Sequence, residues 1–416
     1  MQDTRSQFCL PPEIVREIVA WSTDHSDLCS YCLVSRTWRG AALPFLFRNI
    51  KVIEQHDMIR WHHILTVSPE ITKCIRKFSF QTSYQKYTMP PALALVSLPT
   101  MAGVVELEWI APQDYPLKMI PAIVDFLRTF PNLRRVSVSG AFSDVKTFEY
   151  FLANCGPIRE LSLKDPLLFK FGWDEESPSS KKLDVSQLDL SGLESLEVAA
   201  ENFSLFDWVL ILFRHSKPVK IRSFMIESIA FSTSTNLLPL PTSFPILPNL
   251  QKLELAVIHL GGRFHPERIL CWAEDFFRLL DAPGLQVFEL YWYAGEPEEV
   301  EEILESYDWK GFCGVLLERF PKVQELVLHI GQEMNFGRTW REKLEQTVVK
   351  HIPASLLDGR RITQKWTVEN ENWGSYSDYD SNDGSGAFSD SEDVETIGPF
   401  HVTSYHFAPP SLFLPF

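Results

Sequence analysis

The sequence lacks the short motifs that accompany the common catalytic sites. It contains no Gly-x-Ser-x-Gly elbow, no His-Glu-x-x-His, no P-loop and no Gly-x-Gly-x-x-Gly. The adjacent pair His62 and His63 does not indicate a metal site, because neighbouring residues on a helix point in different directions. Acidic pairs such as Glu301 and Glu302 lie in a charged run that is typical of a solvated helix face. We therefore expect a protein that binds rather than reacts, without catalytic residues, metal or cofactor.

An excess of basic residues and a long hydrophobic run are absent as well. The 416 residues include 54 acidic and 39 basic ones, and the basic doublets are isolated, which argues against a nucleic-acid partner or an anionic membrane surface. The longest apolar run, at residues 203–213, is interrupted by Asp207 and is too short to span a bilayer. Residues 1–8 lack the apolar core of a signal peptide. These absences predict a chain that engages neither nucleic acid nor a membrane.

Cysteine is sparse and irregular. The seven cysteines are an odd number scattered over a long chain, which does not fit a disulfide framework. Cys29 and Cys32 form a single Cys-x-x-Cys, but neither a second pair nor a His-x-x-His accompanies it. Structural cysteines are therefore favoured over a zinc site. Free cysteines predict a reducing compartment, so we expect the protein in the cytoplasm, the nucleus or both.

The first fifty residues, in contrast, carry a dense apolar pattern. The prolines at 11–12 open a predicted helix, and Ile14, Ile18 and Trp21 follow at spacings of three and four to form one apolar face. A second helix is predicted at residues 28–39, and a third short apolar block follows it. A unit this small covers only part of its apolar surface. Some of that surface should therefore face a partner or the rest of the chain.

Several residues in this stretch follow a fixed order and spacing: Leu10-Pro11-x-Glu13-Ile14-x-x-x-Ile18, then Leu28, then Cys32-Leu33-Val34-Ser35-x-x-Trp38, then Leu46-Phe47. This arrangement resembles an F-box, although the link at residues 21–27 is longer and more polar than the compact form. F-box families dock onto a Skp-type adaptor and, through it, onto the cullin of a RING-type ubiquitin ligase. The resemblance implies these adaptor-binding residues: Leu10, Pro11, Ile14, Ile18, Leu28, Leu33, Val34 and Trp38. The alternative is an ordinary helical unit packed on the body of the protein.

After residue 53 one pattern returns: an apolar residue, two mostly polar residues, an apolar residue, any residue and an apolar residue. Its copies lie 25 to 38 residues apart and begin at Ile75, Val104, Leu133, Ile158, Leu193, Ile221, Leu250, Leu285 and Val323. A degenerate tenth copy lies at residues 363–368. The pattern is typical of leucine-rich repeats, and the end of each copy predicts a short strand. Helices are predicted between the copies, at residues 119–130, 145–155, 205–215, 267–281 and 299–320.

Stacked repeats of this kind bury a continuous apolar interior. Many aromatic residues fall at its predicted core positions: Phe78, Phe80, Trp109, Phe126, Phe130, Phe148, Phe151, Phe224, Phe276, Phe277 and Phe288. We therefore predict an α/β repeat fold, in which an N-terminal three-helix F-box-like unit precedes an irregular leucine-rich-repeat solenoid. The alternative is a doubly wound α/β enzyme, in which strands and helices also alternate, although no phosphate-binding glycine loop is present.

Composition divides the chain into an F-box-like helical domain, a repeat solenoid, an acidic segment and an apolar tail, at residues 1–52, 53–368, 369–396 and 397–416. The acidic segment has nine Asp or Glu and no Lys or Arg, which predicts disorder. Within it, Ser377 and Ser389 each have an acidic residue three positions on, as acidophilic kinases prefer; a passive linker is the alternative. We expect the tail to cover the last repeat.

In a repeat horseshoe, the strand residues between the inward-facing ones point to the concave face. Four of the nine central positions there are Glu108, Glu197, Glu254 and Glu289. One hypothesis is that these glutamates bind a basic segment of a target; the alternative is that they only keep the face soluble. Together, repeats and resemblance predict the substrate-recognition adaptor of a Skp/cullin/F-box ubiquitin ligase, a non-catalytic subunit with an unknown protein substrate. The alternative function is a leucine-rich-repeat interaction scaffold outside the ubiquitin system.

Overall fold

The structure of the chain, a computed structural model, describes residues between 10 and 369. The described residues are 10–22, 24–53, 55–81, 98–110, 121–142, 144–169, 188, 190–199, 208–209, 212–213, 220–227, 244, 246–257, 266–294, 305, 307–332 and 363–369. All described residues belong to one compact unit, Met1–Glu371. The predictions for the acidic segment beyond residue 369, its two serines and the apolar tail lie outside the described residues.

Three short helices form the N-terminal unit: α1 (Pro12–Trp21), α2 (His25–Val34) and α3 (Arg36–Leu46). A proline lies in the first turn of α1, where its missing N–H is not needed. The Asp24 side chain caps α2, because it accepts a hydrogen bond from the backbone N–H of Ser26 at 2.7 Å. The small core of the unit draws on all three helices and consists of Val15, Val19, Leu28, Ala41 and Ala42.

The second helix is shorter than the sequence pattern predicts. A single helix was expected over residues 28–39, but Ser35 ends α2 and begins α3. Its backbone is extended (φ −163°, ψ 170°), and its hydroxyl oxygen accepts a hydrogen bond from the Trp38 N–H at 3.4 Å. A serine that caps the following helix competes with continuation of the preceding one, which explains the break. The resulting corner between α2 and α3 places Leu33 and Val34 at the C-terminal end of α2.

The described part of the chain also contains eleven strands, which form a single sheet. They are β1 (Asn49–Val52), β2 (Lys77–Gln81), β3 (Glu106–Ile110), β4 (Arg135–Phe142), β5 (Glu160–Phe169), β6 (Ser195–Ala199), β7 (Ser223–Glu227), β8 (Lys252–Val257), β9 (Val287–Ala294), β10 (Glu325–Gln332) and β11 (Thr363–Glu369). Strand order follows chain order, and every neighbouring pair is parallel. A doubly wound sheet instead reverses its strand order at a switch point. The doubly wound alternative is therefore wrong, and the repeat prediction is confirmed.

The sheet extends one strand beyond the predicted repeats at its N-terminal end. Strand β1 lies within residues 1–52, yet it pairs in register with β2, so that Ile50 lies beside Phe78. The helical unit therefore leads directly into the first strand of the sheet. At the other end, the degenerate tenth copy forms β11, which pairs with β10.

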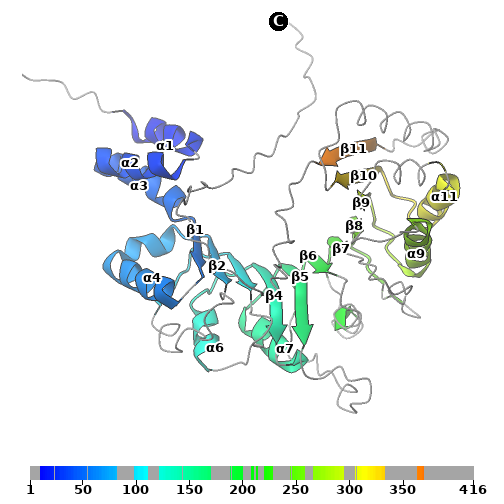
Figure 1. Cartoon of the computed structure of the whole chain (residues 1–416), viewed down its shortest axis with the longest axis horizontal. Helices are drawn as coiled ribbons and strands as arrows, with labels where there is room; N and C mark the ends of the chain where they lie inside the picture. Colours follow the sequence, from blue (N-terminus) through cyan, green and yellow to red (C-terminus); the bar gives the residue numbers. More distant parts are fainter. Residues whose placement is uncertain are drawn as a thin grey trace, which may run out of the picture. The chain divides into compact units, whose positions relative to one another are not determined.

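Helices connect the strands and lie along one face of the sheet (Figure 1). They are α4 (Gln55–Val67), the 3₁₀ helix η1 (Pro69–Lys73), α6 (Pro121–Arg128), α7 (Val145–Asn154), α9 (Pro266–Leu279) and α11 (Trp309–Arg319). Their apolar residues and the inward-pointing strand residues form one continuous core, and every aromatic residue predicted for it is buried. Of the predicted helix at 205–215 the structure describes four residues, all helical. None of the described helices is long and apolar enough to cross a membrane.

Candidate protein-interaction surfaces

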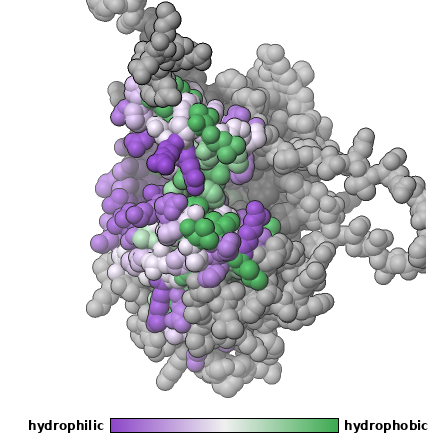
Figure 2. All heavy atoms as spheres, turned by 90° about the vertical axis from the view of Figure 1, so that its left-hand side faces the viewer, coloured by the Kyte–Doolittle hydropathy of each residue, from purple (hydrophilic) through white to green (hydrophobic). Residues whose placement is uncertain are grey.

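The first candidate surface is a set of exposed apolar side chains on the helical unit. Helix α1 is apolar on two sides: Val15 and Val19 are buried in the core, whereas Ile14 and Ile18 stay 46% and 37% exposed. At the end of α2, Leu33 is 88% exposed. We call the full group the exposed apolar set, and it comprises Leu10, Ile14, Ile18, Trp21, Leu33, Val34 and Phe45. Figure 2 faces the side that carries α1–α4 and shows apolar side chains gathered at the surface between polar ones. Such gathering is typical of interaction surfaces.

The eight predicted adaptor-binding residues do not all lie at the surface. The exposed ones are Leu10, Pro11, Ile14, Ile18, Leu33 and Val34. Leu28 is only 6% exposed and belongs to the core of the unit, where it holds α2 in place. Trp38 is half-buried and its ring packs 5.1 Å from the Tyr31 ring. Phe45 was not predicted, although its place in the apolar block before the first strand was a usable signal.

The second candidate surface is the face of the sheet opposite the helices, which we call the open face. Alternation along each strand puts every second side chain there. The parallel register aligns nine of them side by side in what we call the central row: Ser79, Glu108, Ser137, Ser162, Glu197, Met225, Glu254, Glu289 and Val327. These are the nine positions identified in the sequence. The surroundings of its four glutamates, however, differ.

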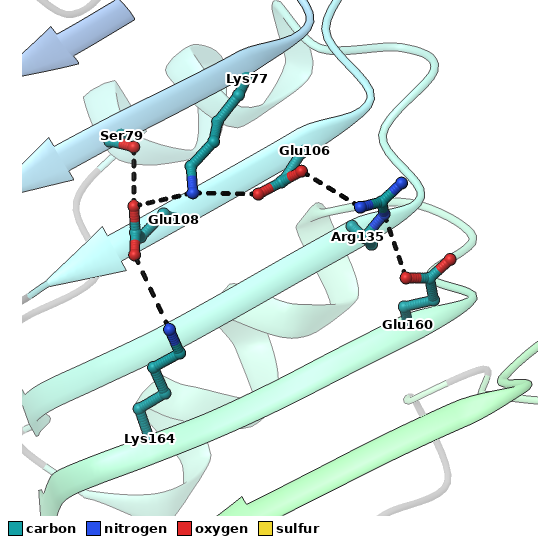
Figure 3. A network of polar contacts seen from close by, with 7 residues as sticks. All are labelled: Lys77, Ser79, Glu106, Glu108, Arg135, Glu160 and Lys164. Carbon is teal, nitrogen blue, oxygen red and sulfur yellow. Dashed lines mark hydrogen bonds and ion pairs between the residues drawn. The ribbon is translucent and has the colours of Figure 1, made fainter. Parts of the chain in front are cut away.

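Over β2–β5 the charges of the open face form one connected network (Figure 3). Lys77 Nζ lies 3.0 Å from Glu106 and 3.2 Å from Glu108. Arg135 bridges Glu106, at 3.4 Å, and Glu160, at 3.0 Å. The remaining links go to Glu108: the Ser79 hydroxyl donates to it at 2.8 Å and Lys164 lies at 4.0 Å. Three carboxylates thus face three cations.

This network keeps Glu108 ionised. Partial burial alone would raise the pKa of the Glu108 carboxyl, but the hydrogen bonds from Ser79 and Lys77, together with the charges of Lys77 and Lys164, lower the pKa below its usual value. Burial likewise opposes the charge on Lys77, and its two glutamate partners outweigh burial and raise its pKa. Glu108 is therefore already neutralised by side chains of its own sheet and has little charge left for a partner.

A second charged group lies on β8–β10. Lys252 Nζ is 3.0 Å from Glu254 and 2.9 Å from Glu289. Glu289 also accepts a hydrogen bond from the Tyr291 hydroxyl at 3.0 Å and lies 3.3 Å from His329 Nε2. The Tyr291 and His329 rings stack, with centroids 4.0 Å apart. Burial would raise the pKa of Glu289, but the hydrogen bonds from His329, Lys252 and Tyr291, with the Lys252 charge, outweigh it and bring the pKa to about 2.

The lowered pKa of Glu289 predicts a pH dependence of stability. Because the folded-state pKa of about 2 lies below the ordinary value of 4.5, ionised Glu289 stabilises the fold above pH 4.5, and this stabilisation is lost as the pH falls towards 2. Between about pH 6 and about pH 3 the wild-type chain should therefore lose more unfolding free energy than Glu289→Gln, as measured by urea unfolding. Glu318→Gln, which removes an exposed carboxylate on α11, should follow the wild type. Parallel curves for all three chains would contradict the prediction.

Glu197 differs from the other three glutamates of the central row. It is half-buried on β6, and within the described part of the chain it has no hydrogen bond or ion pair.

The described side chains of the open face do not form an arrangement that is typical of a catalytic site. Among the described residues no group of three His, Cys, Asp or Glu is placed to hold a metal ion. Cys29 and Cys32 are both free thiols.

Comparisons with known proteins give one family match and weak similarities to solved structures. Residues 8–52 match the family model described as F-box-like. The chain is similar to the crystal structure of the leucine-rich repeat-containing protein LegL7 from Legionella pneumophila, at 16% identity and a TM-score of 0.36, over 73% of this chain and 98% of that chain. It is also similar to the structure of a TLR13-ssRNA13 complex, at 11% identity and a TM-score of 0.30, over 72% and 37%. No curated protein matches the chain. Because these similarities are weak, the leucine-rich-repeat description rests on the strand order and the repeat pattern.

Proposed function

We propose that the chain is the substrate-recognition adaptor of a Skp/cullin/F-box-type ubiquitin ligase. The F-box-like unit would bind a Skp-type adaptor, which connects it to a cullin, and the open face of the repeat sheet would bind the target protein. The observation that carries the proposal is the exposed apolar set, which lies on the unit at residues 8–52 that matches the F-box-like model. The adaptor itself would perform no chemistry, and it would act by holding the target near the catalytic subunits.

The energetics support a partner for the exposed apolar set. Burying one aliphatic side chain of this size is worth about 1.5–3 kcal/mol relative to leaving it in water. Leu33 and Val34 are 88% and 63% exposed and Ile14 is 46% exposed, so the free chain forgoes much of this gain at three positions. Each side chain is held by a short helix rather than a loop, and the Asp24 side chain caps α2. A partner would therefore meet a rigid surface and would lose little conformational entropy on binding.

One observation favours the second candidate function, a repeat scaffold outside the ubiquitin system. The F-box-like segment ends in β1, which pairs with β2, and Phe47 packs against the core of the repeats. The helical unit therefore also serves as the start of the sheet. A scaffold of this kind would need no Skp-type adaptor, and the experiment below separates the two functions.

The test measures binding of the purified full chain to a Skp-type adaptor by isothermal titration calorimetry. Ile14→Asp and Leu33→Asp place a charge on the exposed apolar set without touching the core of the unit. We expect each to weaken binding by about 100-fold, since a desolvated charge in an apolar interface costs several kcal/mol. Ile246→Asp is the matched control, because Ile246 is 65% exposed, between Ile14 at 46% and Leu33 at 88%, but lies in the repeats.

The control should bind the adaptor as the wild type does. Circular dichroism and urea unfolding of each variant verify that the fold is retained. If the wild-type chain does not bind the adaptor, the ligase proposal is wrong and the scaffold function is favoured. Equal losses in all three variants would also contradict it, because the exposed apolar set would then have no special role.

A further inference from the structure

The two halves of the open face differ in charge. Over β2–β5 three carboxylates face three cations, as described above. Over β6–β10 the described open-face side chains include four carboxylates, on Glu197, Glu254, Glu289 and Glu325, and a single ammonium group, on Lys252. His329 is the other titratable base there. The second half is therefore acidic, whereas the first is neutral.

Two of these carboxylates are direct neighbours. Glu254 and Glu289 lie opposite each other on adjacent strands, an arrangement in which like charges destabilise a sheet. Lys252 lies within 3.0 Å of both and is shared between them. Glu289 has two further donors, on Tyr291 and His329. One ammonium group cannot neutralise two carboxylates, so negative charge remains at Glu254.

A second, independent observation lies two strands away. Glu197 has no ion partner within the described part of the chain, and Ser162 is its direct neighbour in register. The Ser162 hydroxyl oxygen is buried and has no hydrogen-bond partner among the described residues. Unmet hydrogen-bonding capacity of this kind costs free energy until a partner supplies it. The central row therefore has unused polar groups at Ser162 and Glu197, beside uncompensated charge at Glu254.

We propose that the central row from Glu197 to Glu289 is the docking surface for a basic segment of the target protein, whose arginine or lysine side chains pair with Glu197 and Glu254. The proposal rests on the proposed function insofar as the open face is taken to be the target-binding surface. Met225 lies between the two glutamates and provides an apolar contact for the aliphatic parts of those side chains. An acidic or phosphorylated segment would instead meet carboxylates of its own sign.

The spacing of the two glutamates defines the segment further. Glu197 and Glu254 are two strands apart, which corresponds to about 9.5 Å at the usual strand spacing. In a polyproline II backbone, residues three positions apart are separated by about 9.3 Å and point to the same side. Two basic residues at positions i and i+3 of an extended segment that crosses the strands therefore match the row.

The test uses the full chain without any adaptor and two short synthetic peptides that differ at two positions only. One peptide has arginines at i and i+3, the other has glutamines there, and binding is followed by fluorescence anisotropy. We expect the arginine peptide to bind about tenfold more tightly than the glutamine peptide. Glu197→Gln/Glu254→Gln should lose this preference. Glu197→Lys/Glu254→Lys should instead prefer a third peptide with glutamates at both positions.

A matched double variant controls for the overall charge. Glu70→Gln/Glu318→Gln removes two exposed carboxylates on η1 and α11 and has the same net charge as the glutamine variant of the row. It should keep the preference for arginine. Equal binding of the arginine and glutamine peptides, equal losses in both double variants, or tightest wild-type binding of the glutamate peptide would overturn the proposal. Since no adaptor is present, such a failure would leave adaptor binding untouched, and loss of adaptor binding would not alter the peptide preference.

Discussion

Replacement of Trp109 with alanine is expected to lower the free energy of unfolding by about 3–5 kcal/mol. The side chain is 1% exposed and lies where three successive repeats meet. Its ring stacks on that of Phe80 of β2, with the ring centroids 4.6 Å apart. The ring centroids of Phe126 of α6 and Phe151 of α7 lie 6.2 Å and 5.2 Å away. Truncation removes all three ring contacts and leaves a cavity that the neighbouring rings cannot fill. Urea unfolding followed by circular dichroism measures the loss.

Two further substitutions separate packing from composition. Trp21→Ala removes the same atoms from a side chain that is 85% exposed and should change the unfolding free energy by no more than about 0.5 kcal/mol. Trp109→Phe should recover most of the loss, because it keeps an aromatic ring beside Phe80 and removes an indole N–H that has no partner among the described residues. A loss in Trp109→Ala no larger than that in Trp21→Ala would contradict the described core.

Replacement of Gly103 with alanine is expected to destabilise the fold by about 1–3 kcal/mol, because one added methyl group would overpack the contact between two repeats. Gly103 lies in the turn before β3. A Cβ atom there would be 2.7 Å from the Ile75 carbonyl oxygen and 2.9 Å from that of Lys73. Both atoms belong to the backbone of the preceding repeat, so the two segments would have to separate. Gly284 has the same place before β9, and a Cβ atom there would be 2.8 Å from the Pro248 carbonyl oxygen.

The control for Gly103 has the opposite sign. Gly314 lies within α11, and a Cβ atom there would meet nothing within 4 Å. Gly314→Ala should therefore stabilise the chain by about 0.5–1 kcal/mol through helix propensity alone. Thermal and urea unfolding of the two variants test both signs together. A neutral Gly103→Ala variant would show that adjacent repeats are more loosely packed than their backbone contacts indicate.

Local patterns predicted most of the architecture, because each repeat is a local unit that repeats its own hydrophobic spacing. The apolar positions of the copy that begins at Val104, including Leu107 and Trp109, are all buried, since strand alternation dictates which side chains face the helices. At Ser35 the prediction from periodicity was wrong. The apolar spacing over residues 28–39 predicted one helix, but Ser35 caps a new helix and divides the stretch in two. The F-box resemblance implied that Leu28 binds the adaptor, and in the structure Leu28 lies in the core of the helical unit.

The pairing of the charged side chains on the open face could not be predicted from the sequence. Alternation alone assigned Glu108, Glu197, Glu254 and Glu289 to the open face as equivalent residues. Whether a carboxylate is neutralised depends on side chains from other strands, such as Lys77 beside Glu108 and Lys252 beside Glu289. These partners are 31 and 37 positions apart in the chain, so no local pattern links them.

The sequence by itself therefore determined the F-box-like unit, the repeat strands and the identity of the residues that share the open face. All of these follow from short-range spacing, which the backbone periods of helix and strand convert into faces. Only the tertiary structure decided which of those side chains are already paired with neighbouring side chains through hydrogen bonds and ion pairs. It pairs Glu108 with two lysines and surrounds Glu289 with three donors, while it leaves Glu197 without an ion partner in the described part of the chain. The physical reason is that electrostatic pairing depends on distance in space, and the parallel stacking of repeats brings together residues that the sequence keeps far apart.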